Sequence, residues 1–178
     1  MRVPRKVFYM NLSAKELFLF LYFYYHRNRN GVVCVSYKRL EREGLYPSTL
    51  RRSLIRLKEK DLVFVKKQYF KYGNTLSHRN CYLINTPPVS EKDPDIPLKE
   101  ILSLKIHPEE KAVLSFLFHL ANPEGDTFSH INEILSCFTP KPHRALKSLM
   151  SKGFCRKTPY GVQIITEKVT GKLQTRDT

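Results

Sequence analysis

The sequence predicts a mainly α-helical fold with small β-hairpins (α+β), formed by two similar units in tandem. The first observation is the order of local patterns in residues 1–85, which runs helix, strand, helix, turn, helix, hairpin. The second is the return of this order after residues 86–97, "TPPVSEKDPDIP", whose four prolines and three acidic residues favour an extended linker. With 178 residues, 42% of them hydrophobic, the chain is long enough for two small domains with buried cores.

Capping and turn signals set the elements of the first unit. The capping-box pattern "SAKE" at residues 13–16 starts the first helix, and Asn30-Gly31 ends it. Pro47 suits the first position of the third helix, because its missing N–H needs no partner there. The expected elements are a helix over 13–27, a strand over 32–35, a helix over 36–44, a helix over 47–60, a strand over 62–70, a loop over 71–79 and a strand over 80–84.

Similar signals return in the second unit. The pattern "HPEE" at 107–110 starts a helix, and a shift of 94 residues places Glu16 on Glu110. A shift of 92 residues places Leu54 on Leu146, which suggests two copies of one unit. The expected elements are a helix over 107–121, a strand over 126–128, a helix over 131–135 capped by Ser129, a helix from Thr139-Pro140 to Gly153, and strands over 155–158 and 162–166. The sequence thus predicts domains over 1–85 and 98–166, a linker over 86–97 and a polar, frayed tail over 167–178.

The first unit carries a family resemblance. A three-helix unit with a tight turn before its third helix is a helix-turn-helix, and a trailing hairpin is called a wing. The segment "VSYKRLEREGLYPSTLRRSLIRLKEKDLVFVKK", residues 35–67, resembles the winged helix-turn-helix of plasmid replication initiators and bacterial DNA-binding regulators. The resemblance covers residues 13–85 well and 105–166 more faintly, and it implies a tandem winged helix-turn-helix protein.

In that superfamily the third helix enters the DNA major groove and the wing touches the adjacent backbone. The resemblance therefore implies these roles for the helix over 47–60 and the hairpin over 62–84. Two features depart from the pattern. Leu45-Tyr46 stands where a small residue and a capping Ser or Thr are usual, and the second unit has three prolines around its third helix.

The formal net charge of +15 indicates a polyanionic partner. Residues 1–85 hold 18 Lys and Arg against 5 Asp and Glu, whereas residues 98–178 hold 12 against 8. We therefore expect double-stranded DNA as the partner, with the first unit supplying most of the affinity.

The third helix of the first unit supplies the main candidate contacts. Leu50, Leu54 and Leu57 form one apolar stripe, so the basic and hydroxyl side chains fall on the other faces. Arginine matches a guanine edge or a phosphate with two hydrogen bonds, and hydroxyls and free N–H groups at a helix start favour phosphate. A solvated charged face is the alternative, but the turn before the helix, the hairpin after it and the domain charge favour DNA. We expect Arg51 and Arg52 near base edges, and Ser48, Thr49 and Arg56 near the backbone.

The hairpin adds candidate backbone contacts. Lysines there would displace counterions from DNA and supply affinity that falls steeply with salt. The expected contacts are Lys66, Lys67, Lys71 and Arg79. For the aromatic residues between them, Tyr69, Phe70 and Tyr72, we favour alternate side chains packing on the helices and the rest lying along the strand. The alternative is that they stack on exposed bases.

The second unit has basic residues at corresponding places. Lys141, His143, Arg144 and Lys147 lie on or before its third helix. We expect them either to contact a second DNA half-site or to form a protein-contact surface, and the sequence does not favour one over the other.

The first helix, within "LFLFLYFYYHRNRN" at 17–30, is apolar on nearly every side. Such a helix is either central to a core or at an interface. We expect the core, with a dimer interface or packing between the two units as the alternatives.

Several other classes of protein are disfavoured. The longest apolar run has nine residues, whereas a membrane span needs about 20, so no membrane partner is expected. Four separated cysteines and the lack of a signal-peptide pattern predict reduced thiols and a cytoplasmic protein. No phosphate loop, zinc-protease motif or nucleophile elbow occurs, so we expect no enzyme, no cofactor, no metal and no small-molecule ligand.

The sequence therefore predicts a sequence-preferring double-stranded DNA-binding protein. The expected process is replication initiation or control, or transfer of a mobile element, with transcriptional regulation as an alternative. A homodimer, or contact with another replication or transfer protein, stays open. The alternative from a different class is a tandem winged-helix interaction scaffold, like those of chromosome-segregation accessory proteins, which would have a nearly neutral or acidic surface.

Overall fold

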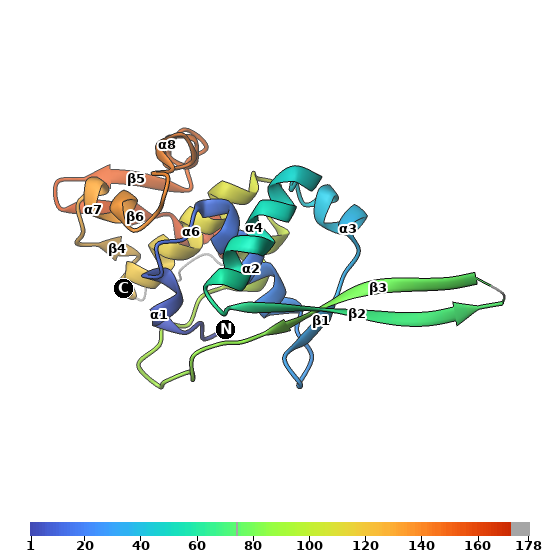
Figure 1. Cartoon of the computed structure of the whole chain (residues 1–178). Helices are drawn as coiled ribbons and strands as arrows, with labels where there is room; N and C mark the ends of the chain where they lie inside the picture. Colours follow the sequence, from blue (N-terminus) through green and yellow to red (C-terminus); the bar gives the residue numbers. More distant parts are fainter. Residues whose placement is uncertain (74, 172–178) are drawn as a thin grey trace.

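Two helices of 13 residues each, α2 (Ala14–His26) and α6 (Pro108–Leu120), pack against each other at the centre of the molecule (Figure 1). The computed structural model describes residues 1–73 and 75–171. Every residue of α2 from Leu17 to Tyr24 is buried. One side of α2 packs on its own unit and another on α6, which explains why apolar residues surround it. The helix therefore belongs to the core and to the packing between the units at once.

Mixed helix and strand, as expected for the α+β class, surround this pair, and each central helix begins a run of elements in the same order. In the first unit α2 is followed by β1 (Val32–Cys34), α3 (Tyr37–Arg42), α4 (Pro47–Glu59), β2 (Val63–Tyr72) and β3 (Thr75–Ile84). In the second unit α6 is followed by β4 (Asp126–Thr127), α7 (Ile131–Ser136), α8 (His143–Ser151), β5 (Cys155–Thr158) and β6 (Gly161–Ile164). Three short helices lie outside this pattern: α1 (Arg5–Phe8), α5 (Leu98–Ser103) and α9 (Thr166–Thr170).

The two sheets have the same topology. Their strand orders are β1-β3-β2 and β4-β6-β5, and all the pairs are antiparallel. In each unit the short strand after the first helix therefore pairs with the returning strand of the hairpin.

The turn before each short strand repeats in atomic detail. The side-chain oxygen of Asn28 accepts from the N–H of Val32 at 3.0 Å, and that of Asn122 accepts from Asp126 at 2.8 Å. The N–H groups of Gly31 and Gly125 donate to the carbonyls of these asparagines, both at 3.0 Å. Both glycines have positive φ angles, +74° and +85°, a conformation that side chains disfavour. The 94-residue shift therefore extends from the helix start to this turn.

Capping explains where the central helices begin. The N–H of Ser13 donates to Glu16 at 3.0 Å while the Ser13 oxygen accepts from the Glu16 N–H at 3.2 Å. At the start of α6 the N–H of His107 donates to Glu110 at 2.8 Å. The expected capping box at residues 13–16 is confirmed, and the helix expected to start at 107–110 begins with a capping box as well.

Several element boundaries differ from the sequence expectation. The expected loop over 71–79 is wrong, because β2 continues to Tyr72 and β3 begins at Thr75. The helix expected from Thr139-Pro140 begins at His143, since Pro142 disfavours a helical conformation at the preceding Lys141. The residue that caps α7 is His130, not Ser129. The tail expected to be frayed forms α9 as far as residue 170, and residues 172–178 lie outside the described part.

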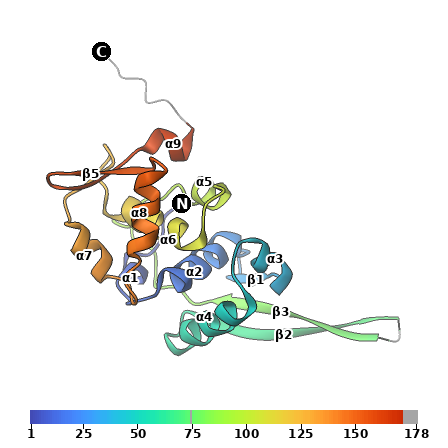
Figure 2. The same ribbon diagram turned by 90° about the horizontal axis from the view of Figure 1, so that it is seen from above.

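The hairpin of β2 and β3 projects from the body of the molecule (Figure 2). Val63, Tyr82 and Ile84 at its base are buried, and Tyr82 stacks on Phe23 at 4.4 Å between ring centroids. Beyond the base, side chains 64–69 of β2 are exposed on both faces. Ten residues of strand correspond to roughly 33 Å, so most of the hairpin forms an arm.

The N-terminal segment and the expected linker over 86–97 lie together. Met1 and Ile96 exchange backbone hydrogen bonds of 2.7 and 3.1 Å, and the N–H of Arg5 donates to Asp93 at 2.9 Å. Phe8 then stacks on His119 of α6, at 4.5 Å between ring centroids. The first residues of the chain are thus tied to the second unit.

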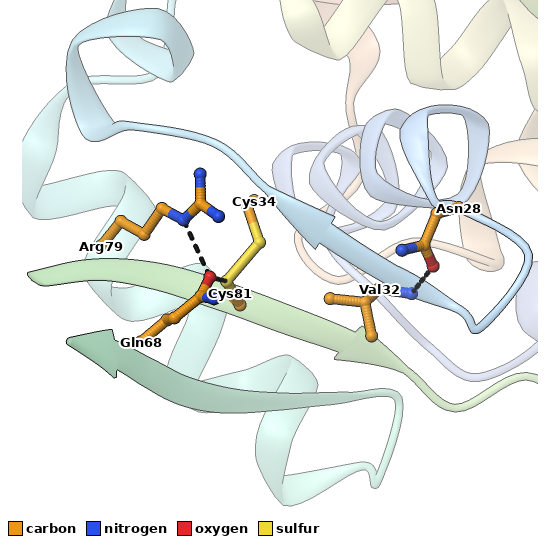
Figure 3. The surroundings of a disulfide bond; sticks show 6 residues. All are labelled: Asn28, Val32, Cys34, Gln68, Arg79 and Cys81. Carbon is orange, nitrogen blue, oxygen red and sulfur yellow. Dashed lines mark hydrogen bonds between the residues drawn. A yellow bond between two sulfur atoms is a disulfide. The ribbon is translucent and has the colours of Figure 1, made fainter. Parts of the chain in front are cut away.

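A disulfide joins Cys34 of β1 to Cys81 of β3 (Figure 3). The two residues are direct partners in the antiparallel register, with their Cα atoms 4.3 Å apart. The expectation of reduced thiols is therefore wrong for this pair, because strand pairing brings together cysteines 47 residues apart. Cys137 and Cys155 are free.

In the described parts of the chain we find no helix that combines the length and the apolar character needed to cross a membrane.

Candidate nucleic-acid interface

Helix α4 presents a polar, basic face to solvent. Leu50, Leu54 and Leu57 are buried, which confirms the predicted apolar stripe. On the outward faces Ser48, Arg51, Arg52, Ile55 and Arg56 are exposed, and Thr49 is half-buried. All five α4 residues expected to contact DNA are therefore accessible at least in part.

The start of α4 has no side-chain cap. Tyr46 occupies the N-cap position, with its ring exposed, and Pro47 is the first helical residue. No side chain competes for the free N–H groups of the first turn, which can therefore donate to an anion. At the other end, Arg56 forms an exposed ion pair with Glu59 at 3.2 Å.

The hairpin places its basic residues along a projecting arm. Lys66, Lys67, Lys71 and Arg79 are all exposed. Lys66 lies opposite Cys81 and Lys67 opposite Asn80, so the two lysines point to opposite faces of the hairpin. Arg79 donates to the side-chain oxygen of Gln68, its register partner, at 2.9 Å. The arm therefore carries positive charge on both faces.

Of the hairpin aromatics, Tyr69 is 61% exposed on the arm beyond the buried base, as expected for those that lie along the strand instead of packing on the helices. The cause is the length of the hairpin, which carries this position past the helices. The side chains of Phe70 and Tyr72 lie outside what the structure describes.

The basic residues of the second unit are exposed as well. His143, Arg144 and Lys147 lie on α8, and Lys141 lies just before it. Like α4, helix α8 begins without a side-chain cap, here at Pro142. The hairpin of this unit has strands of only four residues, so it forms no arm.

A groove of about 870 Å³ lies between α4 and the start of α8. It brings together six of the expected contact residues: Thr49, Arg52, Arg56, Lys141, His143 and Arg144. The other seven, Ser48, Arg51, Lys66, Lys67, Lys71, Arg79 and Lys147, do not line it. The first turn of α2 also lines the groove and adds Lys15, which pairs with Glu109 at 3.2 Å.

The groove and Lys15 were missed at the level of sequence. Lys15 lies inside the capping box, so its position was attributed to helix initiation. Nothing in the spacing of residues 49–56 and 141–144 indicated that they meet. Their meeting depends on the packing of α2 against α6.

The buried ionisable groups elsewhere have structural explanations. Burial lowers the pKa of His119 to about 4, and its ring is stacked on Phe8. Burial also lowers the pKa of Lys111, which pairs with Glu43 at 3.5 Å and donates to the carbonyl of Leu102 at 2.7 Å. Within residues 1–73 and 75–171 no group of three or more His, Cys, Asp or Glu is placed to hold a metal ion.

Comparisons of the chain with protein-family models, with curated proteins and with solved structures found no match.

Proposed function

We propose that this protein binds double-stranded DNA with sequence preference, through two winged helix-turn-helix units. The observation that carries the proposal is the pairing of an exposed basic helix with a projecting basic hairpin along one edge of the first unit (Figure 2). In this arrangement α4 enters the major groove while the hairpin follows the neighbouring backbone.

Helix α4 and the hairpin have different proposed roles because their exposed side chains differ. Arg51 and Arg52 stand on the exposed face of α4, where the guanidinium fork can form two hydrogen bonds to guanine. Lys66, Lys67 and Lys71 lie on the arm and act on phosphates, without regard to sequence. Replication initiation or control, or transfer of a mobile element, is the proposed setting. Transcriptional regulation differs from it in the target site, which selection from random duplexes would reveal.

The test compares wild type with the Arg51→Ala, Arg52→Ala double variant on a selected duplex and on a random one. We expect the preference for the selected site to fall by about 1–3 kcal/mol for each base that an arginine no longer reads. The matched control is Lys99→Ala, Lys105→Ala, which removes the same charge from exposed positions in the second unit. Equal weakening on both duplexes would assign the arginines to the backbone, and failure of wild type to bind any duplex at low salt would refute the proposal.

A further inference from the structure

The groove between α4 and α8 belongs to both units, whose relative position is fixed. Helices α2 and α6 share one core, and two ion pairs cross between the units: Lys15 with Glu109, and Lys111 with Glu43. Residues from the start and middle of α4 face residues from the segment that leads into α8. The two helices therefore meet any ligand as one rigid surface.

The charges of the groove favour an anion. It is lined by five lysine and arginine residues and only two glutamates. Both glutamates already have partners, since Glu16 accepts from the N–H of Ser13 and Glu109 pairs with Lys15. Arg52, Lys141 and Arg144 are exposed cations on the two walls. Thr49 of the first turn of α4 and His143 of the first turn of α8 line the same space, and neither helix has a side-chain cap.

The size of the groove sets which anion it fits. Two DNA half-sites read by separate recognition helices lie about 34–36 Å apart. A groove of about 870 Å³ bordered by both helices is far too narrow for that separation. Its size suits a single sugar–phosphate strand better than a whole duplex, and the half-exposed Ile55 and the exposed Pro140 supply apolar surface for sugars.

We propose that this groove holds one sugar–phosphate strand of the bound duplex, so that α4 and α8 form one composite site instead of contacting two half-sites. The proposal rests on duplex binding by α4. It assigns Arg56 and Arg144, both exposed and on opposite walls of the groove, to neighbouring phosphates of the same strand. This composite site replaces the alternative in which the second unit contacts a separate half-site one helical turn away.

The test is phosphate-ethylation interference on a selected duplex with wild type, Arg56→Ala and Arg144→Ala. Each variant should lose interference at one or two phosphates. The two sets should lie on the same strand within about three nucleotides, since successive phosphates of one strand advance by only about 3.4 Å along the helix axis. Each variant should also reduce the salt slope of binding by about 1. Lys99→Ala, exposed and distant from the groove, should keep the wild-type pattern, and circular dichroism should show all variants folded.

Three outcomes would overturn the proposal. Affected phosphates about 10 base pairs apart would indicate two half-sites. An unchanged pattern for Arg144→Ala would remove the second unit from the DNA, and binding of a polyglutamate peptide that depends on Arg144 would then assign the groove to an acidic protein. If wild type itself shows no interference because it binds no duplex, the proposed function fails together with this inference. In the other two cases α4 keeps its contacts and only the groove is reassigned.

Discussion

The two units differ where they are exposed and agree where they are buried. Both have the same order of elements, the same sheet topology, a capping box at the central helix and the same asparagine–glycine turn. The first has hairpin strands of ten residues and a third helix of 13, whereas the second has strands of four residues and a third helix of nine. The two units therefore share their central helices, sheet topology and turns, and they differ in the lengths of the exposed hairpin and of the third helix.

The divergence also changes electrostatics. Lys and Arg exceed Asp and Glu 18 to 5 in residues 1–85 but only 12 to 8 in residues 98–178. Four of these basic residues, Lys66, Lys67, Lys71 and Arg79, lie on the arm formed by β2 and β3, which has no Asp or Glu. A long, two-sided exposed hairpin contributes little to a core, so its length fits a role in binding.

The largest expected effect concerns the disulfide, which the first sheet has and the second lacks. Replacing both Cys34 and Cys81 by Ser should lower the free energy of unfolding by about 2–4 kcal/mol, because the link constrains the unfolded chain. Denaturant unfolding under oxidising conditions measures this loss, and a reducing agent should produce it in wild type alone. Cys137→Ser, at a free thiol, is the matched control and should change stability by no more than about 0.5 kcal/mol. Four reactive thiols in the unfolded, non-reduced protein would contradict the link.

A smaller loss of stability is expected from replacing the capping glutamates Glu16 and Glu110, and it should differ between the two. Glu110 is buried and forms an ion pair with Lys152 at 2.7 Å, whereas the equivalent of that lysine, Lys60, donates to the carbonyl of Met10. Burial opposes the charged form of Glu110, but hydrogen bonds from Lys152, Ser148 and His107 outweigh it and lower the pKa of the carboxyl. Glu110→Gln should therefore cost about 1–3 kcal/mol at neutral pH, more than Glu16→Gln.

The sign of the pH dependence follows from that lowered pKa. The folded state keeps Glu110 ionised to lower pH than the unfolded state does, whose carboxyl has a pKa of about 4.3. Its contribution is complete above that value and is lost as the pH falls toward the folded pKa. Unfolding measured between pH 7 and pH 3 should show a shallower loss of stability for Glu110→Gln than for wild type. If stability falls equally steeply with pH in Glu110→Gln and in wild type, the ion pair does not stabilise the fold.

Sequence patterns between neighbouring residues predicted most of the helices and strands. They did not predict the length of the exposed hairpin or the contacts between residues far apart in the sequence. The capping box at residues 13–16, the helix start at 107–110 and the leucine stripe of α4 depend on neighbours in sequence, and the structure confirms all three. The length of the hairpin was missed because strands exposed on both faces show no alternation of apolar and polar residues. The disulfide and the groove were missed because they depend on strand register and on the packing of α2 against α6.

The smallest expected effect concerns the asparagine side chains of the two similar turns. It tests whether both side chains stabilise the fold to a similar extent. Asn28 accepts from two backbone N–H groups and Asn122 from one, using the side-chain oxygen in each case. Asn28→Ala and Asn122→Ala should each cost about 0.5–1.5 kcal/mol in thermal or denaturant unfolding. Aspartate keeps the accepting oxygen, so Asn28→Asp and Asn122→Asp should lose less than the alanine variants. If the alanine and aspartate variants at either position are equally stable, the asparagine side chain does not stabilise that turn. The two turns would then share only their backbone conformation.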